Sequence, residues 1–183
     1  MLNNTYSRGM AALRFARGVT GDASYLNVSD SEVPAMRLAY LRATLMEYVG
    51  MEEVLPIDLQ AFPTREAPIK IWDTESPMLI LIRELRNIQL HVVNSELASE
   101  EREATLMTEP PQPLKLDVCI VPEVDLDRLT ASKTAKCFDS HGFERGIAWL
   151  KGAQRFWGIG EVVRESIQEF ARRIVARHIS GAG

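Results

Sequence analysis

The chain has 183 residues, of which 46% are apolar and 25% are charged, and this length and composition suit a single globular domain with a sizeable core. Its net charge of −4 argues against a broad surface that grips nucleic-acid phosphates, so we expect any contact with nucleic acid to be local. Because the sequence has neither a long uncharged apolar run nor a signal-like apolar start, we expect no membrane span and a cytoplasmic location.

The first part of the chain shows two stretches in which apolar residues recur at helical spacing. The first stretch predicts a short helix over about 6–17 that Gly18 ends, and the second predicts a helix over about 31–49. Pro56 is expected to close this region, because proline lacks the backbone N–H that a helix needs. Residues 69–72 alternate between apolar and polar side chains and indicate a short strand.

A third helix is marked by Ser76 and Pro77, because serine favours the cap and proline the first position of a helix. We expect this helix to run to about Glu96. The acidic run that follows, residues 99–103, is predicted to be a solvated loop or an extension of the helix.

The second half of the chain combines extended and helical patterns. Three prolines within 110–113 predict an extended linker, and the alternation over 114–121 predicts a half-buried strand. The remaining sequence predicts helices over about 125–135, 143–156 and 161–178. We therefore predict one mainly α domain over 1–183, with a helical core at about 31–98 and 125–179 and a Pro-rich linker with a strand at about 108–122.

The third helix carries the polar side chains that are most able to do chemistry. Arg83, Asn87 and His91 follow one another in steps of four residues, so they share one face of the helix, and Arg86 lies at the margin of that face. The opposite, buried face is predicted to hold Leu81, Ile82, Leu85, Ile88, Val92 and Val93. Leu79, Ile80 and Leu90 intrude into the polar face, so we expect something to cover it, for example a second chain.

Arginine, asparagine and histidine side chains together are able to bind and cleave a phosphodiester bond. An arginine can hold a phosphate with two hydrogen bonds and stabilise the charge of a five-coordinate transition state. A histidine titrates near neutral pH and can pass a proton to or from a ribose 2′-hydroxyl. Neither His141 and His178 nor Cys119 and Cys137 have a second ligand at metal-binding spacing, so we expect no metal or other cofactor.

The segment from Arg86 through Asn87 to His91 resembles the motif of HEPN-domain proteins, in which four to six residues separate an arginine from a histidine and a polar residue follows the arginine. The resemblance covers mainly residues 31–94. It implies a HEPN-like helical bundle that forms a homodimer, with two copies of the motif near the two-fold axis. It also implies a metal-independent endoribonuclease in which a ribose 2′-oxygen attacks the adjacent phosphorus and leaves a 2′,3′-cyclic phosphate. In this reading Arg86 and His91 are catalytic, Asn87 supports them and Arg83 grips the substrate phosphate.

The same resemblance implies biological partners and leaves other functions open. Many such proteins act on RNA in toxin–antitoxin or phage-defence systems, so RNA and a cognate antitoxin or defence protein are the expected partners. Others bind RNA, a nucleotide or a protein without cleaving anything, and a structural or regulatory helical protein with a solvated polar face is a third reading. Spacing alone is a weak signal, because Arg173 and His178 repeat it without a following asparagine.

Three aromatic residues near the end of the second half, Trp149, Phe156 and Trp157, allow two interpretations. They could stack on nucleic-acid bases, but their helical spacing favours a place in the core. We therefore predict that they are buried.

Overall fold

The computed structural model describes residues 2–20, 26–61, 66–91, 97–106, 108–130 and 140–179, and at 89–91, 106, 124 and 140 it describes only the backbone. These residues form a mainly α fold with one two-stranded antiparallel hairpin, which confirms the predicted class. The elements are α1 (Asn3–Thr20), α2 (Val33–Leu59), the 3-10 turn η2 (Trp72–Thr74), α3 (Pro77–His91), β1 (Ala98–Leu106), β2 (Gln112–Ile120), α4 (Glu123–Thr130), α5 (Ser140–Trp157) and α6 (Ile159–His178).

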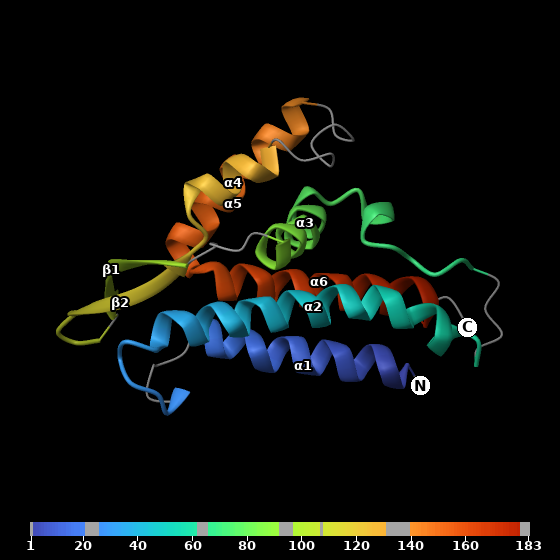
Figure 1. The fold of residues 1–183 in the computed structure, drawn as a ribbon, viewed down its shortest axis with the longest axis horizontal. Helices are drawn as coiled ribbons and strands as arrows, with labels where there is room; N and C mark the ends of the chain where they lie inside the picture. Colours follow the sequence, from blue (N-terminus) through green and yellow to red (C-terminus); the bar gives the residue numbers. More distant parts are fainter. Residues whose placement is uncertain are drawn as a thin grey trace.

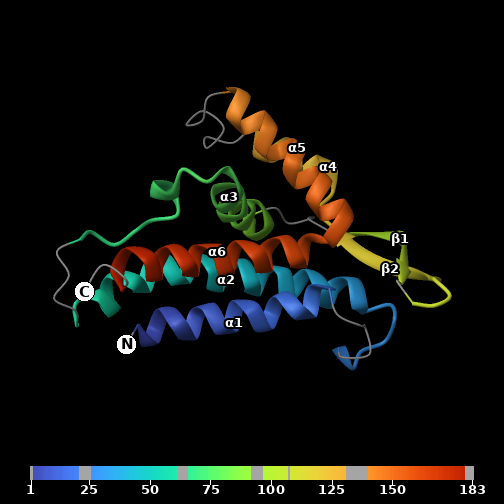
Figure 2. The same ribbon diagram turned by 180° about the vertical axis from the view of Figure 1, so that it is seen from behind.

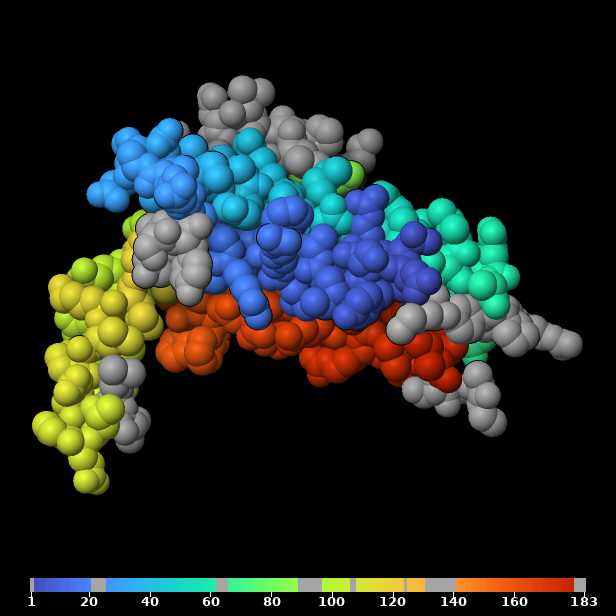
Figure 3. Space-filling view, turned by 90° about the horizontal axis from the view of Figure 1, so that it is seen from below, coloured from blue at the N-terminus to red at the C-terminus, as the bar shows by residue number. Residues whose placement is uncertain are grey.

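Three long helices, α1, α2 and α6, run alongside one another and form a bundle in which α1 packs against both α2 and α6 (Figure 1). α3 crosses this bundle, and α4 and α5 lie on the opposite side of α3 from α1 (Figure 2). Seen from below, α1 lies between α2 and α6, and the β1–β2 hairpin projects beyond one end of the helices (Figure 3). The core lies where α3 packs between its neighbours, and its largest fully buried side chains include Tyr48, Leu79, Leu81, Leu85, Leu126 and Phe170.

Glycines let α1 approach both of its neighbours closely. A Cβ atom at Gly18 would lie 2.6 Å from the ring of Tyr40 in α2, and one at Gly160 of α6 would lie 2.5 Å from Cγ2 of Thr20. Gly18 is therefore a packing residue inside α1, and the prediction that it ends the helix is wrong. The error arises because the contact that requires glycine comes from another helix.

α2 continues through Pro56 to Leu59, so the prediction that this proline closes the region is wrong. A proline inside a helix removes a backbone hydrogen bond, but burial of Leu55 and Leu59 in the core stabilises this last turn. The strand predicted over 69–72 is also wrong, because Ile71 leads directly into the turn η2.

The hairpin contains one strand that was predicted and one that was not. β2 confirms the strand within 108–122, and it pairs with β1 from Ala98 opposite Ile120 to Leu106 opposite Gln112. The acidic run 99–103 lies in β1 and is neither loop nor helix. Its strand conformation depends on pairing with β2, which local sequence does not reveal.

A buried arginine attaches the hairpin to α2. Nη1 of Arg37 donates a hydrogen bond of 2.9 Å to Oδ2 of Asp117 and one of 3.2 Å to Sγ of Cys119. Ser99 of β1 is hydrogen-bonded to the same carboxylate. Burial raises the pKa of the Cys119 thiol, and the neighbouring guanidinium only partly offsets that effect. Cys119 is 3% exposed and thus packs as a small apolar residue.

The helices of the second half occur in the predicted order as α4, α5 and α6, and residues 131–135 of the first predicted helix lie outside the described residues. Gly158, whose φ of 80° suits glycine, separates α5 from α6. The helix predicted from Ser76–Pro77 is α3, and residues 92–96 of its expected length lie outside the described residues. None of the described helices has the length and apolar composition needed to cross a membrane.

The aromatic residues of α5 contradict their predicted place in the core. Phe156 is 69% exposed, Trp157 is 63% exposed and Trp149 is 42% exposed. The buried side of α5 is instead set by Gly146, which packs against Leu81 of α3. Docking of α5 on α3 therefore turns the aromatic residues outward.

Candidate functional site

The first turns of α3 are buried on almost every side. Leu79, Ile80, Leu81, Ile82 and Leu85 are at most 2% exposed. α3 contacts α2, α4, α5 and α6, and the hydroxyl of Tyr48 donates a hydrogen bond of 3.2 Å to the Leu79 carbonyl. The intruding apolar residues Leu79 and Ile80 are thus covered by the same chain, and the side chain of Leu90, the third intruding residue, lies outside the described part of the structure.

Arg83 is held by two carboxylates and one aromatic ring. Its Nη1 donates a hydrogen bond of 3.2 Å to Oε1 of Glu84, and its Nε lies 3.5 Å from Oε2 of Glu52, an ion pair without hydrogen-bond geometry. Its guanidinium carbon lies 5.4 Å from the ring centroid of Trp72. These contacts satisfy the charge of Arg83 within the chain, so it is not an open phosphate-binding group in this structure.

Glu84 joins Arg83 to the motif residues. Nδ2 of Asn87 donates a hydrogen bond of 3.2 Å to Oε2 of Glu84, and Nη1 of Arg86 donates one of 3.3 Å to Oδ1 of Asn87. A continuous line of hydrogen bonds therefore runs from Arg83 through Glu84 and Asn87 to Arg86. We call these four residues the α3 polar cluster.

The charges of the α3 polar cluster are only partly balanced near Arg86. Glu84 is 7% exposed and interacts with Arg83 and Asn87. Arg86 has no carboxylate within ion-pair distance among the described residues, and its buried Nε has no hydrogen-bond partner there. Among the described residues, Arg86 is therefore the cation of the cluster that has no carboxylate partner.

His91 is the last residue of α3, and its side chain lies outside the described part of the chain. Its backbone follows Arg86 by five residues, which turns the two Cα–Cβ bonds about 140° apart around the helix axis. A meeting of Arg86 and His91 at one phosphate remains a prediction. It requires the long arginine side chain to bend toward the histidine, or a second subunit to complete the site.

The second arginine–histidine pair has a structural role. His178 is 4% exposed, and its Nε2 accepts a hydrogen bond of 3.2 Å from the N–H of Ile69. Nη1 of Arg173 donates one of 2.8 Å to the carbonyl of Thr74. Burial lowers the pKa of the His178 imidazole, and the nearby Arg177 lowers it further, so the neutral ring is favoured. These two side chains fix the segment before α3 onto α6.

No group of three or more metal-ligating side chains occurs among the described residues. Nothing in that part of the chain therefore points to a metal centre, and the α3 polar cluster must be considered through its own hydrogen-bonding and charged groups.

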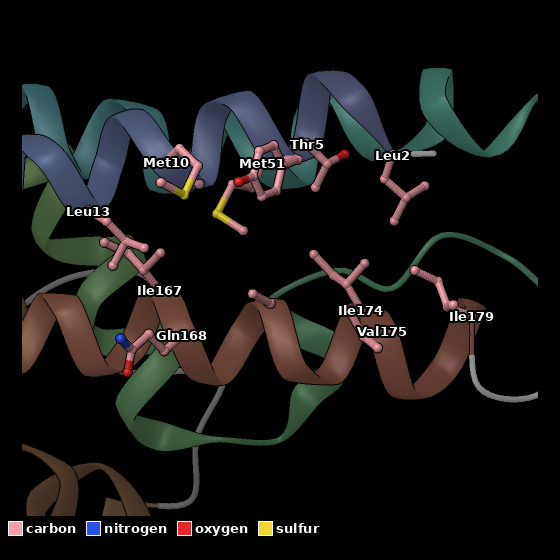
Figure 4. Close-up of a pocket in the computed structure, with 13 residues that line it drawn as sticks. Leu2, Thr5, Met10, Leu13, Met51, Ile167, Gln168, Ile174, Val175 and Ile179 are labelled. Carbon is pink, nitrogen blue, oxygen red and sulfur yellow. The ribbon is translucent and has the colours of Figure 1, made fainter.

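A separate apolar groove of about 290 Å³ lies between α1 and α6, with Met51 of α2 at its floor (Figure 4). Several of its lining side chains are partly exposed, namely Tyr6, Met10, Val175 and Ile179. The groove is remote in sequence from the α3 polar cluster, and none of the lining residues is charged. Apolar surfaces of this kind mark sites of interaction with other molecules.

Sequence reasoning identified the shared face of Arg83 and Asn87 but missed two features. It did not predict that Glu84 would be buried between them, although a glutamate one and three residues from these partners was a visible signal. It also missed the groove, because the facing residues come from both ends of the chain.

Comparisons of the chain with protein-family models, with curated proteins and with solved structures found no match.

Proposed function

We propose that this chain is a HEPN-like protein that acts on RNA, and that Arg86, Asn87 and His91 form its site. The observation that carries the proposal is the direct hydrogen bond between Arg86 and Asn87 in the turn of α3 that precedes His91. The bond orients a guanidinium that has no carboxylate partner among the described residues, as a phosphate site requires. The mainly α fold agrees with the family resemblance at the level of class.

The reaction that suits these groups is cleavage by the 2′-hydroxyl of the substrate itself. His91 takes the proton of a ribose 2′-hydroxyl, the 2′-oxygen bonds to the adjacent phosphorus, and the bond to the 5′-oxygen breaks. The guanidinium of Arg86 stabilises the extra negative charge of the five-coordinate phosphorus. The departing 5′-oxygen takes up a proton, and the products are a 2′,3′-cyclic phosphate and a 5′-hydroxyl.

Two subunits could bring together the arginine and the histidine that a single α3 helix turns apart. A single α3 turns Arg86 and His91 to different sides, whereas a homodimer with its motifs near the two-fold axis would present two histidines to one substrate. One histidine could then accept the 2′-hydroxyl proton and the other protonate the departing oxygen. We therefore include a homodimer in the proposal, and a cognate antitoxin or defence partner as its biological counterpart.

A second candidate is a module of the same kind that binds RNA, nucleotide or protein without cleavage. Glu84 favours it, because this buried carboxylate occupies Arg83 and Asn87 and adds negative charge beside the expected phosphate position. In that case Arg83 stabilises the fold through Glu52 and Glu84 and does not touch the substrate.

The test is incubation of the purified protein with total RNA in EDTA, followed by analysis of the RNA ends. The proposal expects new 2′,3′-cyclic phosphate ends from the wild-type protein and none from His91→Ala or Arg86→Ala. The matched control is Arg14→Ala on the exposed side of α1, which should cleave like the wild type. RNA that stays intact but binds the protein would support the module, and cleavage retained in His91→Ala would contradict the proposed site.

A further inference from the structure

α5 presents a continuous stripe of exposed residues on the side that faces away from the protein core. Arg145, Trp149, Gly152 and Phe156 follow one another in steps of four, three and four residues, so they lie on one face over about 16 Å of helix. All four are exposed. We call this face the α5 stripe.

The opposite face of α5 is fixed, which makes the α5 stripe a stable surface. The side chain of Gln154 accepts a hydrogen bond of 3.0 Å from the N–H of Val121 and donates one of 3.1 Å to its carbonyl. Leu150 is fully buried on the same side. The helix therefore cannot turn its aromatic residues into the core without breaking these contacts.

Gly152 is the least expected member of the stripe. It lies near the middle of α5, where glycine weakens a helix relative to alanine. A Cβ atom at this position would meet nothing within 4 Å, so no contact inside the molecule requires a glycine there. Its effect is to leave a shallow gap on the helix between Trp149 and Phe156, where a flat ring could lie close to the backbone.

The charges beside the stripe favour an anionic ligand. α5 carries Arg145, Lys151 and Arg155 against a single acidic residue, Glu144, in a chain whose net charge is −4. Arg155 lies 3.3 Å from Glu123, while Arg145 and Lys151 have no ion pair with any residue that the structure describes. Arg145 lies on the α5 stripe itself, whereas Lys151 lies about 120° around the helix from it, so Arg145 is the cation that accompanies the exposed rings. Aromatic rings beside a cation are a surface that single-stranded nucleic acids use for base stacking and backbone contact.

We propose that the α5 stripe binds single-stranded RNA, with bases stacked on Trp149 and Phe156 across Gly152 and with Arg145 near the phosphates. This inference rests on the proposed action on RNA, because it assigns the stripe to the substrate of the α3 site. A protein surface is the competing occupant, but the positive charge of Arg145, which has no ion pair with a described residue, suits an RNA backbone.

The experiment measures binding of a fluorescein-labelled single-stranded RNA oligonucleotide by fluorescence anisotropy in EDTA, with His91→Ala present in every protein to prevent cleavage. Trp149→Ala and Phe156→Ala are each expected to weaken binding at least about fivefold, the effect of losing one stacked base. Met46→Ala is the control, since Met46 is a large apolar residue of α2 that is 44% exposed and lies outside the groove lining, and it should bind like its parent.

Gly152→Leu gives the sharpest result, because its effects on stability and on binding are opposite. A Cβ atom at this position meets no other atom and leucine favours a helix more than glycine does, so the melting temperature should rise, whereas RNA binding should weaken because the gap is filled. Unchanged RNA affinity in Gly152→Leu and in both truncations would overturn the proposal, as would truncations that change only the oligomeric state seen by size-exclusion chromatography.

These outcomes are separate from those that test the proposed function. Cleavage that depends on His91, combined with unchanged affinity in the stripe variants, would leave the function standing and overturn the stripe. If the wild-type protein cleaves no RNA but the stripe variants bind RNA more weakly, the α5 stripe is supported as an RNA-binding surface. The proposed nuclease activity is then contradicted.

Discussion

Glu84 and Asn87 are one turn apart on α3, and the amide of Asn87 donates a hydrogen bond of 3.2 Å to the buried carboxylate of Glu84. The same carboxylate accepts a hydrogen bond from Arg83. Asn87 is thereby fixed in the orientation in which its oxygen accepts from Arg86. A negative charge thus orients the side chains of a site that we propose binds a phosphate.

The first prediction follows from that arrangement. Glu84→Gln removes a buried negative charge near the proposed phosphate position, so RNA affinity should rise by about two- to fivefold. The free energy of unfolding should fall by about 1 kcal/mol, because the hydrogen bonds of Glu84 to Arg83 and Asn87 lose their charge. Fluorescence anisotropy and urea denaturation measure the two effects.

Glu47→Gln is the control for this substitution. Glu47 is a partly buried glutamate paired with Arg8 at 2.9 Å on another part of the fold, and RNA affinity should not respond to its loss of charge. Unchanged or weaker RNA binding by Glu84→Gln would show that its carboxylate does not oppose the ligand.

The second prediction concerns Asp58, which caps the start of α1 from α2. Its carboxylate accepts hydrogen bonds of 2.7 Å from the N–H of Thr5 and 3.3 Å from that of Asn4. Asp58→Asn should lower the free energy of unfolding by about 1 to 2 kcal/mol at neutral pH, as the loss of a helix cap does. Urea denaturation measures this, with the exposed Asp30→Asn as a control that should leave stability unchanged.

The effect of Asp58→Asn should also depend on pH. Burial raises the pKa of the Asp58 carboxyl, but the hydrogen bonds from Thr5 and Asn4 outweigh it and leave the pKa below its ordinary value of 3.8. The folded state therefore favours the carboxylate, whose stabilisation is present above pH 3.8 and is lost as the pH falls through the lower folded-state pKa. The stability difference between the wild type and Asp58→Asn should narrow in that acidic range, and a difference that stays constant would contradict the cap.

The third prediction concerns the attachment of the hairpin. Arg37→Met keeps the apolar stem of the buried side chain but removes the hydrogen bonds to Asp117 and Cys119. Since Asp117 is half exposed and can be hydrated, the free energy of unfolding should fall by about 1 to 3 kcal/mol. Hydrogen exchange of the β2 backbone amides should accelerate more than that of α1, and Arg37→Lys should show a smaller effect. Equal acceleration in both elements would mean that Arg37 does not specifically hold the hairpin.

The fourth prediction tests whether the groove between α1 and α6, rather than the face of α3 that carries the motif, is the interface of a dimer. Val175 is 45% exposed and lines this groove, so Val175→Glu would place a charge in an apolar interface. The dimer dissociation constant should rise by at least about a hundredfold. Size-exclusion chromatography with light scattering measures this, and Met46→Glu, an exposed position of α2 outside the groove lining, should stay dimeric. A wild-type protein that is monomeric would contradict the homodimer, and a dimer unaffected by Val175→Glu would place its interface elsewhere.

The sequence predicted those features of the fold that depend on neighbours along the chain. Ser76 and Pro77 marked the start of α3, and the alternation over 114–121 marked β2, because caps and strand faces are local signals. Gly18 was misinterpreted because its reason is the ring of Tyr40, which approaches from another helix. β1 was missed because an acidic run becomes a strand only through its partner.

The candidate site shows the same limit. Helical spacing predicted that Arg83 and Asn87 share a face, and Glu84 joins them in the structure. Spacing could not show that Arg83 would form an ion pair with Glu52, since this contact joins two different helices. The outward direction of Trp149 and Phe156 was equally hidden, because it follows from the docking of Gly146 on α3.

The projecting hairpin separates the sequence into two halves whose helices pack against one another. Everything before its tip supplies α1, α2 and α3, everything after it supplies α4, α5 and α6, and α6 packs against α1 and α2 from the earlier half. The tip residues 108–111 are all exposed, which makes them accessible to a broad-specificity protease. A molecule severed there should keep its helices assembled without a covalent link, so the two fragments, produced as separate polypeptides, should recombine into the native fold.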